Sequence, residues 1–328
     1  MENRNENTKA LVEAGMISAL MVILSLVIVY TGLGQIFAVS ILPIPITILF
    51  LRQNMKTALI ASLISTILVA LLFNPIQAVA NTLLYGLVGV GLGTLLKTKL
   101  SVGKILGLFG LLVALASCLY LIIYANFVYK LGIDGFIDLI VKQNNMASDI
   151  TKNLMGNVAK NPKEIAQMDL IGRYLNKDFI LKTLPAMIIF IGYGAAYLNL
   201  LITRAVLRRL RIKTIENISF TKIYISNKIA AFMIIIFLIG GILSSKKIFI
   251  GESITISSIY VIGTILLLQG MSLTAYFLMN KYSVSRNMVL IILAGTFMFN
   301  LYMAFIILGV IDLVMNFRKL DPNPILKN

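Results

Sequence analysis

Residues 102–128, VGKILGLFGLLVALASCLYLIIYANFV, are apolar almost throughout and carry one charge, at Lys104. An α-helix crosses the hydrocarbon core of a bilayer with about 20 apolar residues. Inside that core every backbone N–H and C=O group must be bonded within the protein, and an α-helix achieves this within one segment. The stretch therefore predicts a membrane-spanning helix and an all-α fold.

The whole chain has the composition of a membrane protein. Of its 328 residues, 59% are hydrophobic and 13% are charged, and the mean hydropathy is +0.93. Soluble domains carry roughly 25% charged residues, so the composition excludes a soluble fold. The chain has no His and one cysteine, Cys118, which excludes His-based catalysis and zinc or iron–sulfur centres. We expect no metal and no cofactor.

About nine segments are predicted to cross the membrane as a polytopic helical bundle. They are 10–30, 36–51, 57–73, 76–96, 102–128, 179–206, 227–243, 253–280 and 288–316. The second is short and contains Pro43 and Pro45, which membrane helices tolerate where neighbouring helices or a cavity satisfy the freed backbone groups. The predicted domains are a six-helix membrane core, 1–206, and additional transmembrane helices, 207–328.

The Lys and Arg residues predict the orientation. With Met1 in the cytoplasm, the inner connections hold Arg4, Lys9, Arg52, Lys56, Lys97, Lys99, Lys104, Arg204, Arg208, Arg209, Arg211, Lys213, Lys222, Lys228, Lys281 and Arg286. The short outer connections hold only Lys246 and Lys247, a bias typical of a multi-pass protein of the cytoplasmic membrane. Nine spans place the C-terminus outside, whereas a bent pair of short helices in 288–316 would return it inside. We prefer nine.

The segment 131–178 is predicted to lie outside the membrane on the extracytoplasmic side. Met146, Ile150, Leu154 and Val158 recur at helical spacing, and Asn161-Pro162-Lys163-Glu164 has the pattern of a helix start. The segment is therefore interpreted as amphipathic helices on the membrane or the bundle, and an ordered linker is the alternative.

Polar residues within the fourth span are the candidates for ligand contact. Asn74, Gln77, Asn81 and Tyr85 fall on one helix face, and Gln35 lies at the outer start of the second span. Polar groups inside a bilayer are costly and often functional. Together they predict an outward-facing pocket between the two spans, with hydrogen bonding between helices as the alternative.

Small and basic residues predict further contacts. Ala10, Ala14 and Ser18 repeat every four residues in the first span, and Gly89 with Gly93 forms a similar pair in the fourth, which predicts close helix packing. A basic run after the sixth span is predicted to contact anionic lipid headgroups; it consists of Arg204, Arg208, Arg209, Arg211 and Lys213. No nucleic-acid-binding motif accompanies this run.

Two resemblances follow from particular stretches. Residues 184–213, LPAMIIFIGYGAAYLNLLITRAVLRRLRIK, together with Gly309-Val-Ile-Asp312 and Phe317-Arg318-Lys319, resemble the YybS-like family of bacterial membrane proteins, a domain of unknown function. Residues 10–206 resemble the substrate-capture (S) components of energy-coupling-factor transporters. The matching features are the Ala10-x-x-x-Ala14 repeat, the Pro43-Ile-Pro-Ile-Thr47 stretch and the glycine-rich fourth span.

The second resemblance implies an outward-opening substrate pocket. It also implies docking of Ala10, Ala14 and Ser18 on a membrane coupling subunit, with separate ATPase subunits supplying energy. The predicted function is therefore a small-molecule binding or transport subunit, and the alternative is a non-transporting scaffold or regulator. An intramembrane enzyme is not expected, because Glu13 and Asp312 are isolated and no nucleophile is paired with a base.

Overall fold

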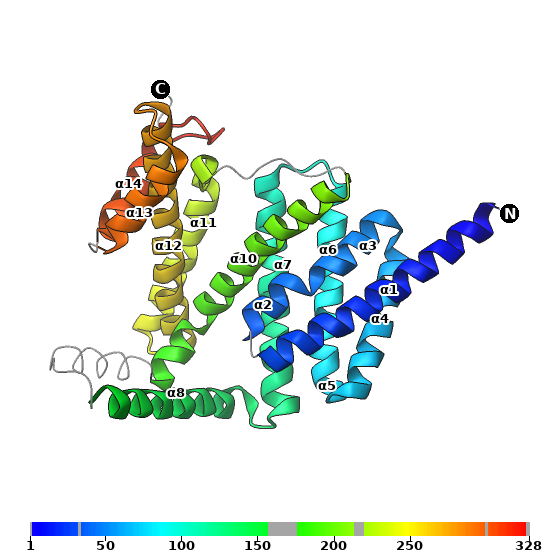
Figure 1. Ribbon diagram of the computed structural model, residues 1–328. Helices are drawn as coiled ribbons and strands as arrows, with labels where there is room; N and C mark the ends of the chain where they lie inside the picture. The colour runs from blue at the N-terminus through cyan, green and yellow to red at the C-terminus, as the bar shows by residue number, and fades with distance from the viewer. Residues whose placement is uncertain (1, 32–33, 157–175, 213–219, 299–300, 326–328) are drawn as a thin grey trace. The chain divides into compact units, whose positions relative to one another are not determined.

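The computed structural model describes residues 2–31, 34–156, 176–212, 220–298 and 301–325. Its contacts divide the chain into two compact units. The first unit is Met1–Leu181 with Met187–Ile215, and the second is Lys182–Ala186 with Glu216–Asn328. Every regular element of the described residues is a helix (Figure 1), which confirms the all-α bundle. The predicted domain boundary at residues 206 and 207 stays a prediction.

Seven stretches of the described residues are long and apolar enough to cross a membrane. They are Thr8–Thr31 within α1 (Glu2–Thr31), α4 (Met55–Leu72), the continuous α5–η1–α6 (Pro75–Ala78, Val79–Leu83, Leu84–Lys97), α7 with η2 (Val102–Ile123, Tyr124–Val128), α10 (Lys177–Arg209), α11 (Asn227–Ser245) and α12 (Phe249–Asn280). Each coincides with one of the nine predicted spans. The other two predicted spans have a different structure.

The predicted second and ninth spans are both divided into short helices. The second consists of α2 (Gly34–Ile41) and α3 (Pro43–Arg52), and Pro43 stands at the start of α3, where its missing N–H leaves no helical bond unmade. The ninth consists of α13 (Arg286–Met298) and α14 (Tyr302–Met315). At 1.5 Å per residue α13 and α14 are each about 20 Å long, and α2 and α3 are about 12 and 15 Å long, all shorter than the roughly 30 Å hydrocarbon core. Seven of the nine predicted spans are therefore long single stretches of helix, and the full count of nine stays a prediction.

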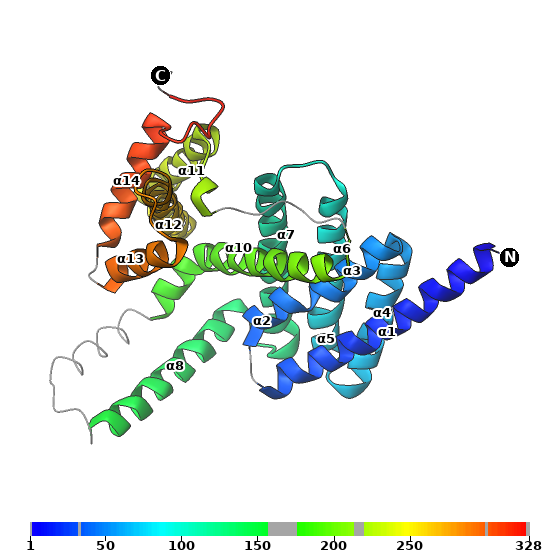
Figure 2. The same cartoon turned by 45° about the horizontal axis from the view of Figure 1, so that its top comes forward.

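Glycines bring α3 and α6 together in the first unit (Figures 1 and 2). A Cβ atom at Gly89 would collide with the backbone carbonyl of Pro43, and one at Gly93 would collide with the Phe50 ring. The buried Thr47 hydroxyl donates to the Gly89 carbonyl oxygen at 2.9 Å. The predicted close packing through Gly89 and Gly93 is therefore confirmed.

The amphipathic segment forms the helix α8 (Gly132–Gly156) over its described part. In Figure 1, α8 begins near the end of α7 and runs crosswise to α6 and α7. Ile137 is buried, whereas Met146 and Ile150 are exposed. The predicted helix is confirmed over these residues. The predicted helix start at 161–164 lies outside the described residues, and the extracytoplasmic side of the segment stays a prediction.

The second unit is built around α12 and α14. Their backbones cross closely, because a Cβ atom at Gly270 would meet the Phe305 carbonyl and one at Gly309 would meet the Leu266 carbonyl. After α14 the chain turns back, and the carboxylate of Asp321 accepts a hydrogen bond from the backbone N–H of Asn227 at 2.7 Å. The residues after α14 therefore lie beside the start of α11, so α13 and α14 form the bent pair of short helices.

Candidate functional site

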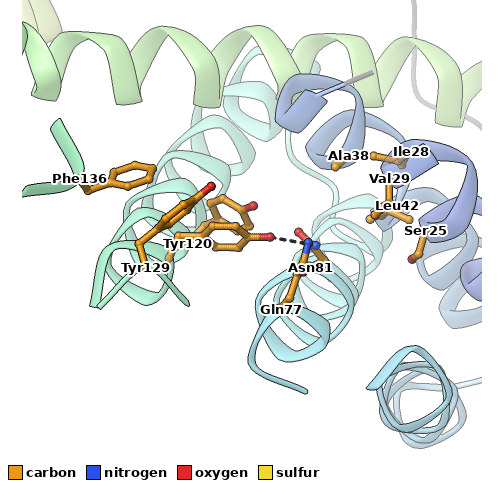
Figure 3. Close-up of a pocket in the computed structure, with 11 residues that line it drawn as sticks. Ser25, Ile28, Val29, Ala38, Leu42, Gln77, Asn81, Tyr120, Tyr129 and Phe136 are labelled. Carbon is orange, nitrogen blue, oxygen red and sulfur yellow. Dashed lines mark hydrogen bonds between the residues drawn. The ribbon is translucent and has the colours of Figure 1, made fainter. Parts of the chain in front are cut away.

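A pocket of about 410 Å³ lies within the first unit, at one end of its helices. Its lining falls into three groups (Figure 3). An aliphatic wall from α1, α2 and the residue before α3 comprises Ile28, Val29, Ala38 and Leu42, and the hydroxyl of Ser25 on α1 lies beside it. An aromatic wall from α7, η2 and α8 comprises Tyr120, Tyr124, Tyr129 and Phe136, and the amides Gln77 and Asn81 lie between the two walls.

Two π-helical segments face each other at this pocket. Asn81 lies in η1 (Val79–Leu83), and Tyr124 begins η2 (Tyr124–Val128). The Asn81 Nδ2 atom donates to the Tyr124 hydroxyl at 3.4 Å, which is long for a hydrogen bond. π-helical turns are rare and occur frequently at functional sites. Their occurrence at this pocket marks it as the candidate functional site of the first unit.

Two buried polar atoms of the pocket have no hydrogen-bond partner within the described residues. They are Oδ1 of Asn81 and Oγ of Ser25. Both residues also line an adjoining cavity of about 10 Å³ beside Val69 and Phe73, which is at the lower limit of the space for one water molecule. A buried polar atom left unbonded costs about 1–3 kcal/mol. These atoms therefore require water or a bound molecule.

The aromatic wall is a continuous series of ring contacts. The Tyr120 and Tyr124 rings stack with centroids 4.2 Å apart, and Tyr129 and Phe136 lie 5.0 Å apart. Tyr85 lies behind the wall, 6.3 Å from Tyr120 and fully buried. The Phe136 side chain makes α8 part of the pocket.

The predicted polar face is only partly gathered at the pocket. Gln77 and Asn81 line it. Asn74 is exposed and caps α5, since its Oδ1 atom accepts from the Ile76 N–H at 2.9 Å. Tyr85 supports the aromatic wall from behind. Gln35 belongs to α2, but its side chain lies outside the described residues.

Sequence reasoning missed the aromatic wall and Ser25. Tyr120 and Tyr124 are four residues apart and so share a helix face, a signal that was available. Ser25 gave no such signal, because single hydroxyls are common in membrane helices. Its role depends on the position of α1 against α5 and η1.

The small-residue face of α1 is occupied within the same unit. Ala14 and Ser18 are buried, and the Ser18 hydroxyl donates to the Ala61 carbonyl oxygen of α4 at 3.0 Å. Ala10 is partly buried on the same face. These residues hold α1 against α4, which leaves little of this face for a partner subunit.

The charged residues near the helix ends have simpler roles. Arg208, Arg209 and Arg211 are exposed and free to meet lipid headgroups, Arg204 is half-buried, and Lys213 lies outside the described residues. Glu13 is paired with Arg52 at 2.8 Å, which joins α1 to α3. The described residues contain no group of three or more His, Cys, Asp or Glu residues that could hold a metal.

The second unit contains a buried ion pair. Arg318 donates to Asp312 Oδ2 at 2.7 Å and to the backbone carbonyls of Thr221 and Ile223 at 2.8 and 2.9 Å. Gln269 donates to the same Asp312 oxygen, and Ser272 accepts from Arg318. Gln269 and Ser272 of α12 thus make hydrogen bonds to Asp312 and Arg318.

Comparison with known proteins gives a family match over most of the chain. The model of the family described as "Predicted membrane protein (DUF2232)" matches residues 19–313. A protein of Bacillus subtilis (strain 168), described as "Uncharacterized protein YybS", is 24% identical over 324 residues, which cover 96% of this chain and 99% of the relative. No solved structure matches the chain.

Proposed function

We propose that this chain, which belongs to the DUF2232 family of membrane proteins, is a small-molecule binding subunit of a transport system. In this proposal the pocket of the first unit captures the molecule. The resemblance of residues 10–206 to energy-coupling-factor S components stays a prediction, since the family that matches is DUF2232 and no solved structure matches the chain. The protein binds and does not catalyse.

The observation that carries the proposal is the pair of unpartnered atoms in the pocket. Oδ1 of Asn81 and Oγ of Ser25 are buried without a hydrogen-bond partner among the described residues. A pocket of about 410 Å³ falls in the range of small-molecule sites, roughly 300–1,000 Å³. If the pocket served only to bond helices together, the two atoms would remain unbonded and would lower the stability of the protein. A ligand that bonds to them removes this cost.

Energy for transport would come from other proteins. No phosphate-binding glycine loop occurs in the sequence, so we propose separate membrane coupling and ATPase subunits. Because Ala14 and Ser18 are buried, the coupling subunit would meet a different face from the one predicted.

A non-transporting scaffold is the second candidate function. The bond between Asn81 and Tyr124 favours it, because it joins the fourth and fifth spans without any ligand. In a scaffold, the amides hold helices together and the pocket has no specific occupant.

The test is purification of the full chain in mild detergent, followed by mass spectrometry of bound small molecules and proteins. Asn81→Leu removes the buried acceptor and Asn74→Ala is the matched control, since Asn74 lies outside the pocket. We expect a compound that is enriched in the wild type and the control and depleted at least about tenfold in Asn81→Leu, with little change in melting temperature. Coupling and ATPase subunits in the same preparation would support transport.

Two results would contradict the proposal. One is the absence of any compound enriched over an unrelated membrane protein purified in parallel. The other is a lower melting temperature or yield of Asn81→Leu with unchanged bound compounds, which is the expectation for a scaffold.

A further inference from the structure

We propose that the pocket takes an uncharged planar heterocycle with a lactam group, that is, a ring N–H beside a ring C=O. The ring lies against the tyrosine wall and the lactam pairs with the side-chain amide of Asn81. This inference rests on the proposed function and adds the chemical class of the ligand.

The charge of the ligand follows from the lining. The aliphatic wall, the aromatic wall and the two amides contain no Asp, Glu, Lys or Arg residue. A charge brought into such a site loses its hydration and finds no counter-ion, which is strongly unfavourable. The pocket therefore selects against ions and favours neutral molecules.

The planar shape follows from the two walls. Figure 3 shows Tyr120 and Tyr129 on one side and Ile28, Val29 and Leu42 on the other, with Gln77 and Asn81 between them. Aromatic rings stack favourably in offset arrangements, and aliphatic side chains pack against the opposite face of a ring. A flat ring can satisfy both walls at once while its edge meets the amides.

The lactam follows from the hydrogen-bonding groups. Nδ2 of Asn81 is engaged by the Tyr124 hydroxyl, whereas Oδ1 has no partner within the described part of the chain and so calls for an N–H or O–H donor. An adjoining C=O on the ligand can accept from the Ser25 hydroxyl, which can serve as donor or acceptor. A lactam presents both groups side by side.

Three compounds with the same ring system test the requirements for a neutral ligand and for a lactam N–H separately. 2-Quinolone is neutral, planar and has the lactam N–H. 1-Methyl-2-quinolone keeps the ring and the carbonyl but lacks the donor, and quinoline-2-carboxylate is an anion. Binding of each to the full chain in mild detergent is measured by equilibrium dialysis, and uptake by detergent alone is subtracted.

We expect 2-quinolone to bind about tenfold more tightly than its methylated form, because methylation leaves Oδ1 unbonded. Quinoline-2-carboxylate should bind more weakly still. The preference for the N–H compound should disappear in Asn81→Leu and persist in Asn74→Ala. Tyr129→Leu, which removes a ring from the wall without touching the bond of Asn81 to Tyr124, should weaken binding of 2-quinolone and 1-methyl-2-quinolone alike.

The inference is overturned if quinoline-2-carboxylate binds as tightly as 2-quinolone, if methylation has no effect, or if none of the three binds above the Asn81→Leu level. The proposed function is judged separately by the compounds that co-purify. A charged or non-planar compound that is lost in Asn81→Leu would support the binding function and refute the ligand class.

Discussion

At the scale of single residues, buried polar groups decide what each unit can do. In the first unit Asn81 lines a pocket, and its buried Oδ1 atom has no hydrogen-bond partner among the described residues. In the second unit Asp312 and Arg318 face each other and the carbonyls of Thr221 and Ile223. Asp312 Oδ1 and Arg318 Nε have no hydrogen-bond partner among the described residues, but the other polar atoms of the two side chains are bonded within the protein, which assigns the pair a structural role.

Arg318→Met is therefore expected to destabilise the protein strongly. The two side chains are 1% and 4% exposed, and loss of one partner of a buried pair typically costs about 3–5 kcal/mol because the other charge is left uncompensated. The measurement is thermal unfolding in detergent. Adding Asp312→Asn should recover part of the loss, since it removes that charge.

The exposed neighbour Lys319 provides the matched control. Lys319→Met removes a cation from the same turn and should leave the melting temperature nearly unchanged. If Arg318→Met and Lys319→Met lowered the melting temperature equally, the buried pair would not be what stabilises the residues after α14.

At the scale of elements, the contact between α3 and α6 is set by a glycine. Gly89→Ala should lower stability by about 1–3 kcal/mol, the usual cost of overpacking, because the added carbon would meet the Pro43 backbone, which cannot rotate away. Gly107→Ala on α7 is the control, since nothing lies near its Cβ position. An unchanged melting temperature for Gly89→Ala would show that α3 and α6 can separate without cost.

At the scale of the whole molecule, the arrangement of the C-terminal helices changes the predicted side of the C-terminus. The turn after α14 lies beside the start of α11, which the Lys and Arg bias predicts to be cytoplasmic. We therefore expect both termini in the cytoplasm, with eight crossings made by the seven long stretches and the α2–α3 pair. This differs from the outside C-terminus that nine full spans would give.

Cysteine labelling in intact cells tests this orientation on a Cys118→Ala background. Ile325→Cys and Asn3→Cys should not react with a membrane-impermeant maleimide, whereas Lys246→Cys, between α11 and α12, should react. Labelling of Ile325→Cys without permeabilisation would mean that the last two helices carry the chain across the membrane.

Part of the candidate site was predictable from the sequence. The spacing of Gln77 and Asn81 on one helix face was sufficient to predict two lining residues, because an α-helix fixes which neighbours share a face. Asn74 shares the same spacing but caps α5 instead, because Pro75 begins a helix there and an exposed N-terminus needs a cap. Periodicity alone does not distinguish a face residue from a cap.

The sequence by itself determined the membrane setting, the all-α class and most of the spans, because these depend on the length and apolar character of continuous segments. Only the tertiary structure decided which polar groups are left unpaired. Ser25, Asn81 and Tyr124 are far apart in the chain and meet through the packing of α1, η1 and η2. It also decided that the chain after α14 returns to the start of α11, where Asp321 accepts from the Asn227 N–H. Contacts between distant residues depend on packing, which no local pattern specifies.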